Sequence, residues 1–167
     1  MEEFQVLRDK ALQKIKIADH MLFMTYPVVK DPKLLLAIVE NIFASLDYGI
    51  GALLHYERLF KRIPPFNDTY PSRLEMFRNK MMPRYKFNSN YVSLIMDVKG
   101  ILSEHKNSPV SFIRKDKFVI CSPSYSIKTI DINLVKKYIF ETKVFVSQVN
   151  KIVSENERIF IRSQGRT

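Results

Sequence analysis

A chain of 167 residues, 46% apolar and 26% charged, is long enough to form one domain around a hydrophobic core without structural metals or disulfides. A single cysteine, Cys121, excludes an intrachain disulfide and is typical of a reducing compartment, and four glycines are too few for a glycine-rich phosphate loop. The longest apolar run, Leu34 to Val39, ends at Glu40 and is too short to cross a membrane. Because acidic residues also stand where a signal peptide would be basic, we expect a cytoplasmic protein with no membrane partner.

Apolar residues at steps of three and four predict a first helix over residues 3–25, which Tyr26-Pro27 should end. Asp31-Pro32 is typical of a helix start and predicts a second helix over residues 32–62. That helix is apolar on several sides, which is typical of the central helix of a bundle. Its two glycines disfavour a helix by about 1 kcal/mol each, so we expect them to permit close helix contact or a bend.

The remaining elements are a short helix, a long helix, a β element and a last long helix. The short helix should begin at Pro71 and end at Pro83, and the next should cover residues 89–105. Alternating residues then predict a hairpin over 111–121, with a further strand over 124–130 left open. Asp131 is a good cap for a last helix that we expect to end near residue 155.

These elements predict a mainly α fold, a bundle of four long helices plus one short helix with a small β-hairpin inserted before the last helix. Residues 1–155 should form a single domain, with the β element at about 111–130. Residues 156–167 are polar, and we expect them to be a frayed tail.

Positive charge and aromatic rings are interleaved over residues 58–90, called the basic segment here. It carries +6 of the net charge of +10, from two acidic residues and eight basic ones: Arg58, Lys61, Arg62, Arg73, Arg78, Lys80, Arg84 and Lys86. Clustered cations favour an anionic partner over simple solvation of the surface, and exposed rings can stack on unpaired bases.

Within this segment, Arg73, Phe77, Lys80 and Arg84 follow one another at spacings of four, three and four residues. Those spacings place the side chains on one helical face, provided that Pro83 does not bend Arg84 away. A second basic cluster lies at the tip of the predicted hairpin. We predict phosphate contacts and base stacking from these residues: Arg73, Lys80, Arg84, Arg114 and Lys117 for phosphates, and Tyr70 and Tyr85 for stacking.

The phenylalanines of the basic segment are more typical of the core, and we interpret Phe60, Phe66 and Phe77 in that way. Polar residues also occur on the predicted central helix, where Asp47 and His55 are two turns apart and Glu57 follows. Buried polar groups need partners, so we expect a hydrogen-bond network there in preference to a metal or catalytic site.

The sequence lacks the motifs of three kinds of catalytic or cofactor-binding site. A di-iron bundle needs Glu-x-x-His on two helices, and no such spacing occurs. The motifs of serine hydrolases and nucleotide-binding loops are also missing, and no histidine is close in sequence to Cys121. We therefore predict no metal, no cofactor and no catalytic residue.

The block ADHMLFMTYPVVKDPKLLL, residues 18–36, together with FKRIPPF, residues 60–66, resembles a family of small archaeal proteins of unknown function. This resemblance implies an archaeal cytoplasmic setting and supplies no activity. The bundle is also similar in outline to HEPN domains, many of which are ribonucleases or RNA-binding partners of nucleotidyltransferases. HEPN ribonucleases carry an arginine followed, after four to six residues, by a histidine. In this chain the nearest substitute is Lys99 before His105, and lysine lacks the planar fork of arginine.

We therefore predict a non-enzymatic, basic helical bundle that binds RNA or a ribonucleoprotein through phosphate contacts. The alternative is a protein–protein adaptor or homodimer that uses the apolar excess of the central and last helices. A third hypothesis is a ribonuclease of altered HEPN type that uses Lys99, His105 and Glu104.

Overall fold

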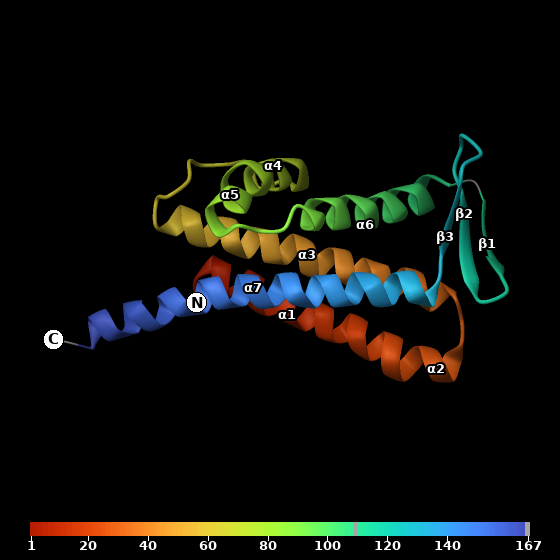
Figure 1. Cartoon of the computed structure of the whole chain (residues 1–167), viewed down its shortest axis with the longest axis horizontal. Coiled ribbons are helices and arrows are strands. Elements are labelled where there is room, and N and C mark those ends of the chain that lie inside the picture. Colours follow the sequence, from red (N-terminus) through yellow and green to blue (C-terminus); the bar gives the residue numbers. More distant parts are fainter. Residues whose placement is uncertain (109, 166–167) are drawn as a thin grey trace.

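The computed structural model describes residues 1–108 and 110–165, except for the side chains of residues 156 and 159–164. The described chain is mainly helical, with a small antiparallel sheet at one end of the helices (Figure 1). In chain order the elements are α1 (Glu3–His20), η1 (Met21–Thr25), α2 (Tyr26–Val29), α3 (Lys33–Leu59), α4 (Tyr70–Met76), η2 (Phe77–Met81), α5 (Met82–Tyr85), α6 (Asn90–Asn107), β1 (Val110–Arg114), β2 (Lys117–Cys121), β3 (Ile127–Ile130) and α7 (Ile132–Gln164).

The helix α3 lies at the centre of the bundle, in contact with α1, α4, α6 and α7 (Figure 1). Its apolar side chains are buried on several sides, which confirms the predicted central helix, although the helix ends at Leu59 and not at residue 62. Among the described helices, α3 is also long and apolar enough to span a membrane by length and composition. Its contacts with four other helices account for the same apolar character.

The first helix does not end at Tyr26-Pro27, because the chain continues as a helix through η1 and α2 to Val29. Proline lacks an N–H and clashes with the carbonyl four residues earlier in a regular α-helix. In this chain the turn before it is a wider π-turn, in which the Tyr26 N–H donates to the carbonyl of Met21. The wider turn accommodates Pro27 without ending the helix.

The same arrangement occurs before Pro83, where the short helix also continues past the predicted end. The Met82 N–H donates to the carbonyl of Phe77 across the π-turn η2, and α5 then extends to Tyr85. A π-turn changes the angular position of every later residue on the helix. Spacings counted for a regular α-helix therefore do not describe which residues share a face from residue 77 onward.

The β element is a three-stranded antiparallel sheet with the order β1-β2-β3, which confirms the hairpin and shows that the further strand forms. The register places Phe112 opposite Val119, and Val119 opposite Thr129. One face of the sheet is buried through Phe118, Ile120 and Ile130, where β2 contacts α6 and α3. The other face is called the outer sheet face here.

The helix α7 begins at the predicted cap, since an oxygen of Asp131 accepts the Leu134 N–H at 2.9 Å. It does not end near residue 155 but continues to Gln164. Gln5 and Arg8 of α1 bind the carboxylate of Glu157, so this last part of α7 has polar partners on another helix. Residues 166–167 of the predicted tail lie outside the described residues, and fraying stays a prediction.

Gly49 on α3 permits a close contact with α7, as expected. A Cβ at residue 49 would lie 2.9 Å from the Cε1 atom of Phe145, whose buried ring also packs on Phe77 and Phe87. We expect Gly49→Ala to lower the free energy of unfolding by about 1–3 kcal/mol, because this packed ring cannot move without strain. Urea denaturation measures the change.

Gly51→Ala is the matched control for that substitution. A Cβ at residue 51 would meet Leu7 at an ordinary distance of 3.4 Å. Alanine favours the helix over glycine by about 1 kcal/mol, so this variant should keep or gain stability. Equal losses in the two variants would contradict the close contact.

Candidate nucleic-acid interface

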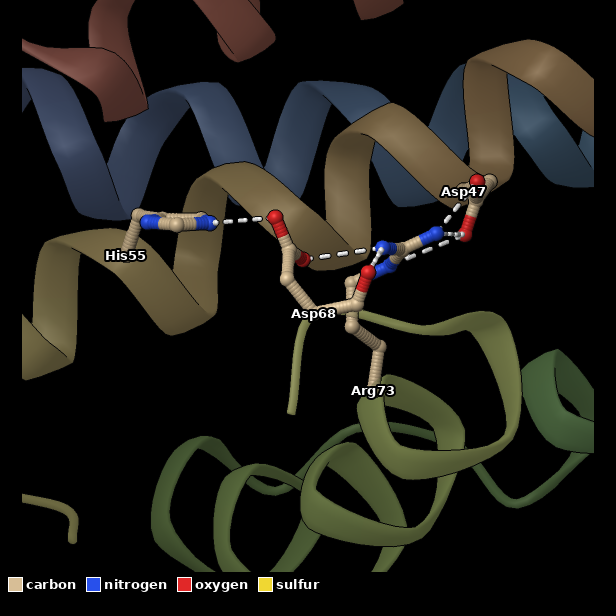
Figure 2. Close-up of polar contacts among 4 residues, drawn as sticks. All are labelled: Asp47, His55, Asp68 and Arg73. Carbon is tan, nitrogen blue, oxygen red and sulfur yellow. Dashed lines mark hydrogen bonds and ion pairs between the residues drawn. The ribbon is translucent and has the colours of Figure 1, made fainter. Parts of the chain in front are cut away.

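Arg73 is held by carboxylates of its own chain (Figure 2). Its Nη2 atom donates to both carboxylate oxygens of Asp47, at 2.9 and 2.8 Å, and its Nε atom also points to Asp47. Its Nη1 atom donates to Oδ1 of Asp68 at 2.8 Å. All three guanidinium nitrogens of Arg73 therefore have partners within the chain, and the predicted phosphate contact of Arg73 stays a prediction.

His55 extends this arrangement into a chain of four polar residues (Figure 2). Its Nε2 atom lies 3.5 Å from Oδ2 of Asp68, close enough for an ion pair when the imidazole is protonated. Burial opposes ionisation of Asp68, but the hydrogen bond from Arg73 and the charges of His55 and Arg73 outweigh it, so the pKa of Asp68 lies below its ordinary value. This confirms the network expected around Asp47 and His55.

A second network surrounds Glu57, a fully buried carboxylate on α3. The Tyr85 hydroxyl donates to its Oε1 atom, and Nη1 of Arg62 lies 3.4 Å from the same oxygen. Nε of Arg84 lies 3.6 Å from Oε2. Tyr85 and Arg84 thus compensate a buried charge, where the sequence predicted base stacking and a phosphate contact.

The predicted stacking residue Tyr70 is half-buried between other side chains. Its ring packs on Phe43 with 5.5 Å between the centroids, and the Lys99 ammonium lies 5.4 Å from the Tyr70 centroid. Burial of the hydroxyl raises the pKa of Tyr70. This ring therefore already has partners within the chain.

Lys80 is exposed and makes no ion pair within the described chain. It does not form one face with its predicted neighbours, because Arg73 is bound to carboxylates and Phe77 is buried in the core. The π-turn accounts for this difference from the α-helical spacing. Among the phenylalanines, the core assignment is confirmed for Phe77, whereas Phe60 is 38% exposed and that assignment was wrong.

Arg114 and Lys117 lie on the outer sheet face, and both are exposed. With Lys115 they surround one end of a hollow of about 340 Å³. The hollow is lined by residues of all three strands and of the β1–β2 turn: Phe112, Arg114, Lys115, Lys117, Val119, Ile127 and Thr129. None of the three cations forms an ion pair with a described residue.

The two basic regions of the sequence lie apart in the molecule, the sheet at one end of the bundle and α4 and α5 beyond the far end of α6 (Figure 1). The segment that contains α4, η2 and α5 is separated from the sheet by α6, which has 18 residues. At 1.5 Å per residue, this helix extends for about 27 Å. The two regions therefore do not merge into one continuous basic surface.

The residues of the altered HEPN hypothesis contact different partners. The Lys99 ammonium lies over the rings of Phe43 and Tyr70, whereas Nδ1 of His105 lies 3.3 Å from the Ser111 hydroxyl. Glu104 pairs with Lys128 at 3.7 Å. These contacts do not assemble a common site. Within the described part of the chain, no group of three or more His, Cys, Asp or Glu side chains could hold a metal ion.

Comparison with protein-family models finds no match, and comparison with curated proteins also finds none. The resemblances to small archaeal proteins and to HEPN domains stay predictions.

Arg73→Lys tests whether the polar chain of Figure 2 stabilises the fold. Lysine keeps the charge but cannot bind Asp47 through two nitrogens and Asp68 through a third. We expect the free energy of unfolding to fall by about 1–3 kcal/mol in urea denaturation. Arg78→Lys, at an exposed position of η2, should leave it unchanged, and equal stability of both variants would argue against the network.

Tyr85 should titrate late, because burial and the hydrogen bond to Glu57 raise its pKa from 10.0 to about 12. A raised folded-state pKa contributes stability that is complete below the unfolded-state pKa and is lost as pH rises through the folded-state value. The stability advantage of the wild type over Tyr85→Phe should therefore shrink between pH 10 and 12. Urea denaturation at several alkaline pH values measures it, and a constant advantage would contradict the contact with Glu57.

Proposed function

We propose that this protein binds single-stranded RNA on the outer sheet face, as a binding protein without catalysis. One observation supports this most strongly. Three cations without ion pairs in the described chain, Arg114, Lys115 and Lys117, line the same hollow as the exposed ring of Phe112. The combination of unpaired positive charge and an accessible ring is what unpaired nucleotides bind.

The ring of Phe112 supplies the contact that requires RNA to be single-stranded. Its side chain is 42% exposed, and its neighbours across the sheet are Val119 and Thr129. A base can stack on this ring only when it is not stacked and paired within a duplex. Strands of four and five residues leave room for a few bases, as on other sheets that bind RNA.

The cations at the β1–β2 turn supply phosphate contacts. Arg114 and Lys117 are cross-strand partners, so their side chains begin at the same level of the sheet. Lys115 lies in the turn between them, with a left-handed backbone at φ 58°. Like charges this close repel one another, and a bound phosphate chain would relieve that repulsion.

The outer sheet face is favoured over the basic segment because the segment uses part of its charge internally. Arg62, Arg73 and Arg84 pair with carboxylates of α3 and of the following loop. Its tyrosines Tyr70 and Tyr85 are half-buried. Lys80 is the one predicted binding residue of that segment that is exposed and without an ion pair in the described chain.

The adaptor or homodimer alternative stays a prediction, as does the cytoplasmic location. Large apolar side chains are exposed on η1, α2 and α7, at Phe23, Met24, Val28, Val29, Phe140 and Val144. The structure contains nothing that shows what covers them. RNA binding is favoured because its candidate surface combines both kinds of contact that the ligand needs.

Fluorescence anisotropy with a short labelled single-stranded RNA tests the proposal. Three neutralised phosphates correspond to a slope of about −2 for the logarithm of the binding constant against the logarithm of salt concentration. Binding should therefore weaken by about 40-fold between about 50 and about 300 mM salt. No detectable binding at the lower salt concentration would refute the proposal.

Variants separate the two contacts. Lys117→Gln should make the salt slope shallower by about 0.7, and Phe112→Ala should weaken binding about tenfold or more at constant salt. Lys80→Gln is the control, since it removes the same charge at an exposed residue of η2, far from the sheet. An equal effect of Lys80→Gln would place the interface elsewhere.

A further inference from the structure

A second hollow, separate from the outer sheet face, lies between α4–η2 and α6. Its volume is about 600 Å³, within the usual range for a small-molecule site. The lining residues come from both sides: Tyr70, Pro71, Leu74, Glu75, Arg78 and Asn79 from α4–η2, and Met96, Lys99, Gly100 and Ser103 from α6. The hollow is called the α4–α6 groove here.

Two cations line the α4–α6 groove from opposite sides, Arg78 on η2 and Lys99 on α6. Neither has a carboxylate partner in the described chain. The Lys99 ammonium instead lies 4.9 Å from the Phe43 centroid and 5.4 Å from the Tyr70 centroid. Nη2 of Arg78 contacts only the weak acceptor Sδ of Met96, at 3.6 Å.

Arg78 contacts Met96, which precedes Lys99 by three residues on α6, so both cations lie at the same stretch of that helix. Lys99 is placed there by its contact with the Tyr70 ring. The groove thus contains two positive charges against the single acidic residue Glu75 among its lining residues.

We infer that the α4–α6 groove binds a small organic phosphate of nucleotide size, with its phosphate between Arg78 and Lys99. Arginine offers a planar fork to phosphate oxygens and lysine a compact charge. The groove also offers neutral hydrogen-bonding groups on Asn79 and Ser103 for the hydroxyls or ring nitrogens of the ligand.

The size and lining of the groove favour an ester over inorganic phosphate alone. Leu74, Met96 and Pro71 give it an apolar wall on which a flat ring or a sugar can pack. Inorganic phosphate would contact the two cations but would leave the apolar wall exposed to solvent. The phosphate and the organic part should therefore both contribute to affinity.

Isothermal titration calorimetry with the full chain tests this inference, with adenosine 5′-monophosphate, adenosine and inorganic phosphate as probes. We expect the monophosphate to bind, adenosine to give no measurable heat, and inorganic phosphate to bind about tenfold or more weakly. Equal binding of adenosine and its monophosphate would overturn the inference, as would no heat with millimolar monophosphate.

Arg78→Gln is the decisive variant, because Arg78 is exposed and its loss does not disturb the core. Removing one charged hydrogen-bond partner should weaken monophosphate binding by about ten- to hundredfold. Lys99→Met should weaken monophosphate binding to a similar extent. The circular dichroism spectrum of this variant shows whether it is folded. Unchanged affinity in Arg78→Gln would refute the site.

Two control variants keep this site distinct from the RNA surface. Lys80→Gln removes a neighbouring charge of η2 that does not line the groove, and it should leave monophosphate binding unchanged. Lys117→Gln removes charge at the sheet and should also leave it unchanged. If Lys117→Gln weakened monophosphate binding and Arg78→Gln did not, the ligand would occupy the sheet and the groove proposal would fail.

Discussion

Glu57 places a fully buried carboxylate on the central helix α3, and Asp47 places a partly buried one there. A charge removed from water costs several kcal/mol unless a partner compensates it. The partners come from the next segment of the chain, Arg73 on α4 for Asp47, and Tyr85 and Arg84 on α5 for Glu57. These contacts bind α4, η2 and α5 to α3, which α6 also contacts directly.

The same contacts divide the positive charge of the protein into two kinds. Arg73 is less available to a ligand, because its guanidinium nitrogens already donate to the carboxylates of Asp47 and Asp68. Some of the cations without such partners in the described chain line the outer sheet face and the α4–α6 groove. The open face with its exposed ring suits a flexible strand, and the groove suits a small ligand. Net charge alone could not distinguish these roles.

Local patterns predicted the local structure, including the long helices, the hairpin and the cap at Asp131, because these depend on residues close in sequence. The helices that continue past Pro27 and Pro83 were missed, since a π-turn depends on packing that periodicity does not report. Arg73 was predicted to contact phosphate. Its partner Asp47 lies 26 residues away in the sequence, so no local pattern indicates that the two residues pair. Acidic residues on an apolar helix were the available signal, since those that are buried there require partners from another element.

The central claim is that pairing with α3 leaves the outer sheet face, and not the basic segment, to contact RNA. Nuclear magnetic resonance with ¹⁵N-labelled protein tests it directly, by mapping backbone amide shifts during titration with a short single-stranded RNA. We predict that the largest changes in amide chemical shift occur in β1, β2 and their turn, around Phe112 and Lys117. The amide chemical shifts around Arg73 and Arg84 should stay unchanged. Shifts centred on α4 and α5, with the sheet unaffected, would contradict the account.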